Sequence, residues 1–190
     1  MSTSFPASNL TIPTPRLLLR RALSSDTEAI HQIRTHPNTT HWTKSTTSDS
    51  VSITEEWIRR MFAPNKFSFL ITLLESREVI GFISLNLPAH SPLPTIGYEI
   101  SPSHWNKGYL TEALTAFLSI YWKIHPEGFE GSKRDENGRA CVVARVEEKN
   151  LASLRVLEKV GFVAIGEERV KDWYGGPDVL LKKLGIWKPE

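Results

Sequence analysis

The middle of the chain constrains the fold most, because the period of its hydrophobic residues changes there. Residues 67–74 and 79–87 are apolar, rich in β-branched and aromatic side chains, and separated by a polar turn, and a third such segment follows at 95–100. This pattern predicts an antiparallel meander of three strands. The apolar residues from 111 to 122 then recur at i, i+3, i+4 and i+7. That spacing predicts an amphipathic helix.

Strands and helices also alternate on both sides of this segment. The other expected elements are a strand at 16–21, helices at 26–34 and 52–62, a loop at 36–50, a strand at 140–146, a helix at 150–160, and a final strand pair at 163–170 and 177–184. The resulting order, β-α-α-β-β-β-α-β-α-β-β, predicts an α/β domain with one mixed, mostly antiparallel sheet flanked by helices.

Length and composition are those of one compact domain. The chain has 190 residues, of which 40% are hydrophobic and 23% charged, which excludes disordered and collagen-like proteins. We expect a flexible tail over 1–13, a single domain over 14–188 and a polar loop insertion near 125–139. The formal charge of +2 gives no reason to expect a nucleic-acid or membrane partner.

The cysteine and histidine content bears on the cellular compartment of the protein and on whether a metal site is expected. The one cysteine, Cys141, cannot form an intrachain disulfide, which favours a reducing compartment, and its apolar surroundings predict an inert core thiol. No segment has the pattern of a secretory signal or the length of a membrane helix, so we expect a cytoplasmic protein. The six histidines show no HExxH-type spacing, so we expect no metal.

The start of the central helix is the first candidate for ligand binding. A helix start leaves backbone N–H groups unpaired and carries a partial positive charge, so the segment 106–111 is suited to a phosphate or pyrophosphate. Gly108 allows an anion to approach the chain closely, and Lys107 adds a cation. The spacing matches neither a P-loop nor GxGxxG. An ordinary strand-to-helix turn, in which Gly108 only relieves a steric conflict, explains the same residues.

The helix at 150–160 carries a second candidate. Asn150 is suited to cap the helix by accepting a hydrogen bond from the Ser153 amide, while Gly161 ends the helix and Phe162 packs back on it. This purely structural interpretation explains most of the segment. It explains Ser153 less well, because serine gains little in the inward-facing first turn of a helix.

Taken together, the two segments SPSHWNKGYLTEAL (101–114) and ARVEEKNLASLRVLEKVGF (144–162) resemble the GNAT superfamily of acetyl-CoA-dependent N-acetyltransferases. The closer likeness is to the branch of ribosomal-protein N-acetyltransferases (RimJ/RimL-like). Three further segments resemble that branch: TPRLLLR at 14–20, EEWI at 55–58 and IGYEI at 96–100. The resemblance implies the GNAT fold, acetyl-CoA as the acetyl donor and an amine as the acceptor.

The resemblance also implies which residues bind coenzyme A. The family's Q/R-x-x-G-x-G/A loop binds the pyrophosphate through backbone amides, and here it corresponds to Trp105, Asn106, Lys107, Gly108, Tyr109 and Leu110, followed by Thr111. Of these, only Gly108 matches strictly, since Trp105 replaces Gln or Arg and Leu110 replaces a small residue. Ile100 and Ser101 would lie beside the pantetheine arm, and Asn150 matches the family's asparagine that reaches it.

The family's usual acid is missing. Many relatives carry a tyrosine that protonates the departing thiolate, and its position is occupied here by Leu157, so Ser153 is the nearest candidate to replace it. The amine must be neutral to attack a thioester, and Glu99 is the candidate base. A solvated strand carboxylate explains Glu99 at least as well. His104 is a weaker candidate, and the position of Glu112 in the first turn of a helix is explained by the helix dipole.

The acceptor site is the least defined. His41 and Trp42 on one side and Trp173 and Tyr174 on the other are candidates to line it, because aromatic rings suit a cationic amine. Packing at the edge of the core explains both tryptophans equally well.

We expect direct attack of a primary amine, on a protein N-terminus or a small molecule, in a ternary complex. Two alternatives remain at this point: a non-catalytic module with the same fold that binds acyl-CoA, and an unrelated α/β domain whose helix start binds another phosphate ligand. A monomer and a homodimer are both compatible with the sequence.

Overall fold

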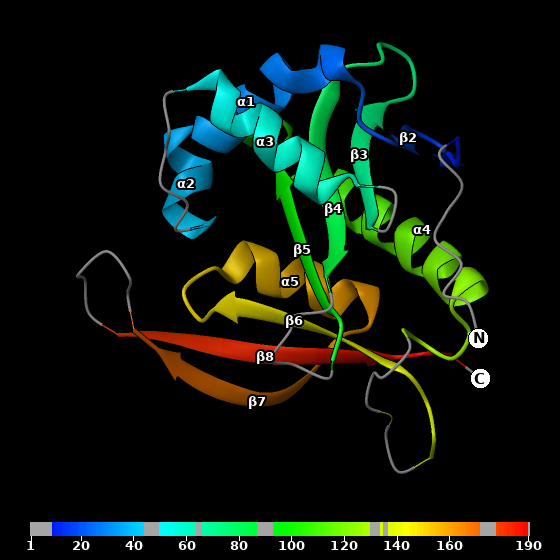
Figure 1. Ribbon diagram of the computed structural model, residues 1–190. Coiled ribbons are helices and arrows are strands. Elements are labelled where there is room, and N and C mark those ends of the chain that lie inside the picture. The colour runs from blue at the N-terminus through cyan, green and yellow to red at the C-terminus, as the bar shows by residue number, and fades with distance from the viewer. Residues whose placement is uncertain are drawn as a thin grey trace.

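The computed structural model describes residues 9–43, 50–63, 66–86, 93–129, 134, 137–171 and 178–189 (Figure 1). Its centre is an eight-stranded sheet with the strand order β1-β2-β3-β4-β5-β6-β8-β7. The strands are β1 (Ile12–Pro13), β2 (Leu17–Arg20), β3 (Phe67–Leu73), β4 (Val79–Asn86), β5 (Thr95–Ile100), β6 (Cys141–Glu147), β7 (Val163–Val170) and β8 (Val179–Trp187). The helices are α1 (Thr27–Thr35), α2 (Pro37–Thr43), α3 (Val51–Met61), α4 (Tyr109–Ile124) and α5 (Leu151–Val160), with short 3-10 helices η1 (Ser24–Asp26) and η2 (Pro102–His104).

The mixed, mostly antiparallel sheet with flanking helices confirms the predicted fold class. All neighbouring strands pair antiparallel except β5 and β6. The predicted meander is β3, β4 and β5, and the predicted amphipathic helix is α4, which extends two residues further at each end. No helix in the described part of the chain combines the length and the apolar character needed to cross a membrane.

Two local predictions are wrong. The segment 36–50, expected to be a loop, contains helix α2 over its first half. This helix lacks an apolar repeat, but Pro37 at its first position has a backbone angle that favours a helix start, and Thr39 is buried. Ile12 and Pro13, expected in the flexible tail, form β1, because Ile12 is buried and pairs with Leu19.

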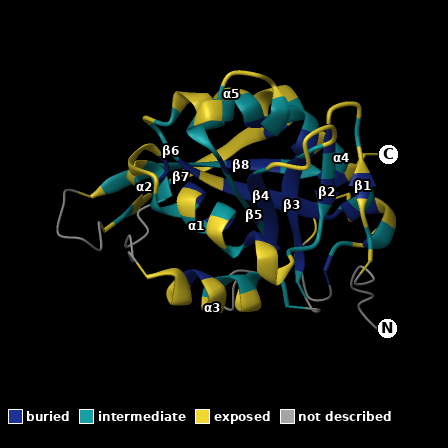
Figure 2. Ribbon diagram, turned by 90° about the horizontal axis from the view of Figure 1, so that it is seen from above, coloured by how far each residue is buried: buried dark blue, intermediate teal, exposed yellow. Residues whose placement is uncertain are grey.

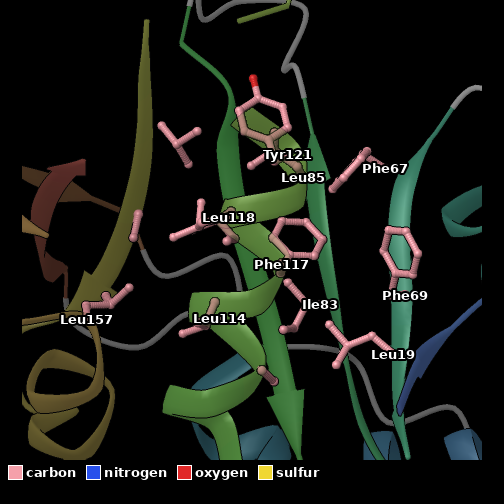
Figure 3. Close-up of a cluster of buried hydrophobic side chains, with 14 of the residues drawn as sticks. Leu19, Phe67, Phe69, Ile83, Leu85, Leu114, Phe117, Leu118, Tyr121 and Leu157 are labelled. Carbon is pink, nitrogen blue, oxygen red and sulfur yellow. The ribbon is translucent and has the colours of Figure 1, made fainter. Parts of the chain in front are cut away.

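Helices cover both faces of the sheet. On one face, Phe117 and Tyr121 of α4 pack on Phe67 of β3, with ring centroids 4.9 and 5.5 Å apart (Figure 3). On the other face, Ile30 of α1 and residues of α3 cover Phe82. Figure 2 shows the buried strands between helices whose outer surfaces are exposed.

The segment predicted as a polar insertion begins inside the core. His125 and Phe129 are both buried, and the Phe129 ring lies 5.5 Å from the ring of Tyr121. Cys141 is also buried, as predicted.

The parallel pair β5 and β6 is joined only at its beginning. The described register pairs Thr95 with Val143, and the Val143 N–H donates to Pro94 O at 2.8 Å. Toward their C-terminal ends the two strands run apart (Figure 1). Successive residues of a strand point their N–H groups to opposite edges, and the N–H of Ser101 bonds to Ile80 of β4. The N–H groups of Tyr98 and Ile100 therefore point to the β6 side, where the described part of β6 gives them no partner.

Candidate active site

The start of α4 has a backbone shape suited to an anion. Two residues of the turn, Asn106 and Gly108, adopt left-handed conformations with φ of 59° and 77°. No side chain caps the helix, and the first intrahelical bond runs from the Glu112 N–H to Gly108 O at 3.1 Å. The N–H groups that precede it are the unpaired donors of a helix start. Asn106, Lys107 and Gly108 are exposed, so these donors are open to phosphate oxygens, and the residues present fit a pyrophosphate.

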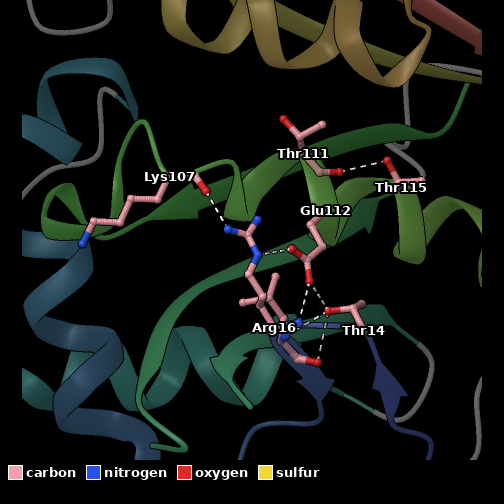
Figure 4. Close-up of polar contacts among 7 residues, drawn as sticks. Thr14, Arg16, Lys107, Thr111, Glu112 and Thr115 are labelled. Atoms are coloured by element: carbon pink, nitrogen blue, oxygen red, sulfur yellow. Dashed lines mark hydrogen bonds and ion pairs between the residues drawn. The ribbon is translucent and has the colours of Figure 1, made fainter. Parts of the chain in front are cut away.

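Arg16, the residue immediately before strand β2, holds this turn in place (Figure 4). Its Nε donates to Glu112 Oε2 at 2.7 Å, and its Nη1 donates to Lys107 O at 3.0 Å. The guanidinium also lies 4.7 Å from the centroid of the Tyr109 ring. One side chain therefore contacts the residue before Gly108, the residue after it and the first turn of α4.

Glu112 accepts several hydrogen bonds, so its interaction with the helix dipole is not its whole role. Thr14 Oγ1 donates to its Oε1 at 2.6 Å, and the Arg16 N–H donates to the same oxygen at 2.9 Å. Burial raises the pKa of this carboxyl, but the hydrogen bonds from Thr14 and Arg16 outweigh burial and hold the pKa below its usual value. Glu112 thus joins the connection between β1 and β2 to the start of α4.

Trp105 fixes the end of β5. Its Nε1 donates to Ile100 O at 2.8 Å, so the indole bonds to the edge of β5 that faces β6. Ser101 Oγ and Ser103 Oγ lie 2.9 Å apart, and His104 Nδ1 lies 2.9 Å from Ser103 Oγ. These polar side chains belong to the connection between β5 and α4.

Asn150 caps α5 as predicted, and Ser153 has a partner that the sequence did not suggest. Asn150 Oδ1 accepts from the Ser153 N–H at 3.1 Å. The Ser153 Oγ lies 2.5 Å from the hydroxyl of Tyr98, so a residue of β5 bonds to the first turn of α5. Burial raises the pKa of Tyr98 to about 12, against the smaller opposing effect of the Ser153 hydrogen bond. Tyr98 is therefore a hydroxyl donor at any physiological pH.

Glu99 lies on the opposite face of β5 from Tyr98. Its register partner on β4 is Phe82, which belongs to the face covered by α1 and α3. Its Oε2 is shielded from solvent and accepts no hydrogen bond. Burial raises the pKa of Glu99 to about 7, and the charge of Arg34 opposes this rise. A carboxyl with this pKa is well matched to proton transfer near neutral pH.

Comparison with known proteins identifies the family. The model of the family described as "Acetyltransferase (GNAT) domain" matches residues 16–163. The chain belongs to this family. Two curated relatives are described as uncharacterized N-acetyltransferases: p20 of Bacillus licheniformis, 26% identical over 80% of this chain and 82% of the relative, and YoaA of Bacillus subtilis, 27% identical over 94% and 97%.

Solved structures of GNAT proteins share the fold. A GNAT acetyltransferase of Bacillus anthracis superimposes with a TM-score of 0.77 at 21% identity, covering 94% of this chain and 98% of that one. Spermidine N-acetyltransferase of Vibrio cholerae, solved with CoA and spermine, gives 0.72 at 18% identity over 92% and 96%. The ribosomal-protein-S5-alanine acetyltransferase of Vibrio fischeri gives 0.70 at 19% over 95% and 100%.

Leu157 occupies the position that the sequence resemblance predicts for a catalytic tyrosine, and it is fully buried within the core. Ser153, one turn earlier on the same helix, carries the hydroxyl that bonds to Tyr98 of β5. The alternation of IGYEI indicates that Tyr98 shares a face with Ile96 and Ile100, but the sequence does not reveal which helix covers that face.

The predicted acceptor residues are described only in part. His41 and Trp42 lie on α2 with ring centroids 4.5 Å apart, and the His41 side chain is exposed. Trp173 and Tyr174 lie outside the described residues. Among the described residues, no group of three or more His, Cys, Asp or Glu side chains is arranged to hold a metal ion.

Proposed function

We propose that this GNAT acetyltransferase transfers an acetyl group from acetyl-CoA to a primary amine by direct attack in a complex that holds both substrates. The observation that carries the proposal is the uncapped start of α4, where Asn106 and Gly108 are left-handed and the exposed turn presents free N–H groups. Trp105, Lys107, Tyr109, Leu110 and Thr111 complete the segment assigned to the pyrophosphate. Lys107 adds a positive charge, while backbone donors supply most of the contacts.

The pantetheine arm is assigned to the region where β5 and β6 separate. The strand edge at Ile100 and Ser101 and the cap residue Asn150 border it. An acyl carbonyl oxygen at this edge would accept from the N–H of Tyr98 or Ile100, which point to the β6 side. Fixed backbone donors of this kind stabilise the oxyanion of a tetrahedral intermediate.

Acetyl-CoA supplies the acetyl group as a thioester. The ammonium passes one proton to Glu99, the neutral nitrogen then forms a bond to the carbonyl carbon, and the carbon–sulfur bond breaks. The second proton that the nitrogen loses after the attack goes to the departing thiolate, so the products are the amide and the free thiol. The hydroxyls of Tyr98 and Ser153 lie within hydrogen-bond distance. In the proposed arrangement Tyr98 is the donor, so the Ser153 hydrogen is free to bond to the departing sulfur. A thiol has an ordinary pKa of about 8.5. The Tyr98 pKa of about 12 therefore makes the pair a hydrogen-bond donor to the thiolate rather than the source of its proton.

The RimJ/RimL-like branch is the proposed subgroup, supported by the five resembling segments and by the likeness to the Vibrio fischeri enzyme. A protein N-terminus and a small-molecule amine both satisfy the chemistry above. His41 and Trp42 of α2 remain the described candidates for the acceptor side, and Trp173 and Tyr174 remain proposals from sequence alone.

The test combines binding with turnover. Coenzyme A at saturating concentration is expected to raise the melting temperature. Acetyl-CoA with a panel of amines is expected to release free thiol. A melting temperature that coenzyme A does not change would contradict the proposed donor. A raised melting temperature without thiol release from any amine would instead indicate a non-catalytic module that binds acyl-CoA. This alternative is supported by Leu157, which replaces the expected tyrosine acid.

A further inference from the structure

Arg34 and Glu99 form an unusual pair of charges on the face of the sheet opposite Tyr98. Arg34 comes from the last turn of α1, and Glu99 comes from the end of β5. Burial lowers the pKa of Arg34, yet a guanidinium remains charged at physiological pH. The two side chains attract each other electrostatically, but no ion pair within 4.0 Å joins them in the described part of the chain.

An aromatic platform holds the guanidinium in place. Arg34 Cζ lies 4.0 Å from the centroid of the Trp57 ring, which is the geometry of a cation–π contact. The Trp57 ring in turn lies 4.8 Å from the ring of Phe82, and Phe82 is the register partner of Glu99. Stacking on Trp57 therefore fixes Arg34 on the same face of the sheet as Glu99.

Both charged groups lack hydrogen-bond partners where they are buried. Arg34 Nε and Glu99 Oε2 are shielded from solvent, and neither makes a hydrogen bond. A buried donor and a buried acceptor left unpaired cost stability, so each such group in a folded protein calls for an explanation, and a role in binding or catalysis is one. The missing partners are a hydrogen-bond acceptor for Arg34 and a donor for Glu99.

An α-amino acid supplies both partners from one small molecule. Its ammonium group is a donor for Glu99, and its carboxylate matches the planar fork of an arginine. A polyamine would bring a second positive charge toward Arg34, where Arg60 already adds a positive charge. A peptide N-terminus presents a neutral carbonyl and leaves the guanidinium charge unmatched.

We propose that the acceptor of this acetyltransferase is a free α-amino acid, held with its amine at Glu99 and its carboxylate at Arg34. The inference rests on the proposed function, since it names the substrate class of that reaction. It adds Arg34 as the residue that selects the carboxylate.

Matched acceptors test the proposal directly. Each of several L-amino acids is assayed beside its carboxamide and its decarboxylated amine, together with spermidine and a dipeptide. The amino acid is expected to exceed each analogue in kcat/KM by about tenfold or more, the effect of a hydrogen bond to a charged group. In Arg34→Gln this preference is expected to disappear. Because loss of the Arg34 charge also raises the pKa of Glu99, each amino acid is compared with its decarboxylated amine within the same variant.

Two further measurements keep the result interpretable. Arg59→Gln is the matched control, because Arg59 is an exposed arginine of α3 paired with Glu56, and its substitution is expected to leave the preference unchanged. The rise in melting temperature with coenzyme A is measured for every variant, and Arg34→Gln is expected to keep it.

Three results would overturn the proposal: a carboxamide or dipeptide as good as the amino acid, a preference for spermidine or the decarboxylated amine, or an unchanged preference in Arg34→Gln. Turnover of those other amines would leave the proposed function intact. Loss of thiol release with every acceptor would overturn the proposed function as well.

Discussion

The hydroxyl of Tyr98 on β5 and the hydroxyl of Ser153 on α5 lie 2.5 Å apart. This bond bridges the two elements beside the place where the parallel strands β5 and β6 separate, and Ser153 is also held by the cap residue Asn150. Two hydroxyls in series, one of them fixed by a helix cap, form a pre-oriented donor. Ser153 lies on the same helix as the buried Leu157.

Removing either hydroxyl is expected to slow turnover without loosening the donor substrate. Tyr98→Phe and Ser153→Ala should each lower kcat by about tenfold to a hundredfold, the range for a hydrogen bond to a charged group, with little change in KM for acetyl-CoA. The two hydroxyls act in series, so the double variant should be no worse than the poorer single variant. Steady-state kinetics of the four proteins measures this. Multiplicative losses, or a rise in KM alone, would contradict a shared donor.

A side chain at Gly108 is expected to damage coenzyme A binding. Gly108→Ala forces an L-residue into φ 77°, which costs roughly 1–2 kcal/mol of stability, and it brings a Cβ to 3.4 Å from Arg16 Nη2. The matched control is Gly138→Ala, because Gly138 has φ 75° with open space around it. Both variants should melt at lower temperature. Only Gly108→Ala should lose the stabilisation by coenzyme A, and an equal loss in both would remove the helix start from the binding site.

Glu112 is expected to stabilise the fold in a pH-dependent way. Its pKa is lowered in the folded protein, so its contribution is present above the unfolded value of about 4.3 and is lost as the pH falls through the folded pKa. Glu112→Gln should reduce the free energy of unfolding near neutral pH, by about 1–3 kcal/mol for weakened bonds to a charged group. Denaturant titrations from pH 3 to 8 should show the two proteins converging at the acid end. A constant difference across this range would show that the carboxylate charge contributes nothing.

The pH dependence of turnover is expected to report Glu99. With a pKa of about 7, its basic form accumulates as the pH rises through neutrality, so kcat/KM should rise through the same range. The rise in kcat/KM could also come from deprotonation of the acceptor amine, and acceptors of different basicity separate the two causes. A rise caused by Glu99 stays at the same pH for every acceptor, whereas one caused by the amine moves with its pKa. In Glu99→Gln the rise that stays at the same pH should be absent. A rise that moves with the basicity of the acceptor would instead assign the pH dependence to the amine.

The sequence predicts what is local and misses what is brought together by packing. The spacing of hydrophobic residues was sufficient to predict β3, β4, β5 and α4. The Asn150 cap could be predicted because it involves only four adjacent residues. Helix α2 lacks that period, so only Pro37 marks its start. The contact of Tyr98 with Ser153 joins positions 55 residues apart and depends on how α5 lies against the sheet. The proximity of Arg34 to Glu99 likewise depends on how α1 covers β5.

Restoring the tyrosine that many GNAT proteins carry is expected to harm this chain rather than improve it. Leu157 is fully buried among core residues, so Leu157→Tyr adds volume and a hydroxyl to a filled space and should cost about 1–3 kcal/mol of stability. Leu157→Met, which nearly conserves volume, is the control and should cost less. Thermal unfolding and kcat are measured for both. If Leu157→Tyr kept its melting temperature and gained activity, the position would open to the substrates, and the hydroxyl pair of Tyr98 and Ser153 would lose its role.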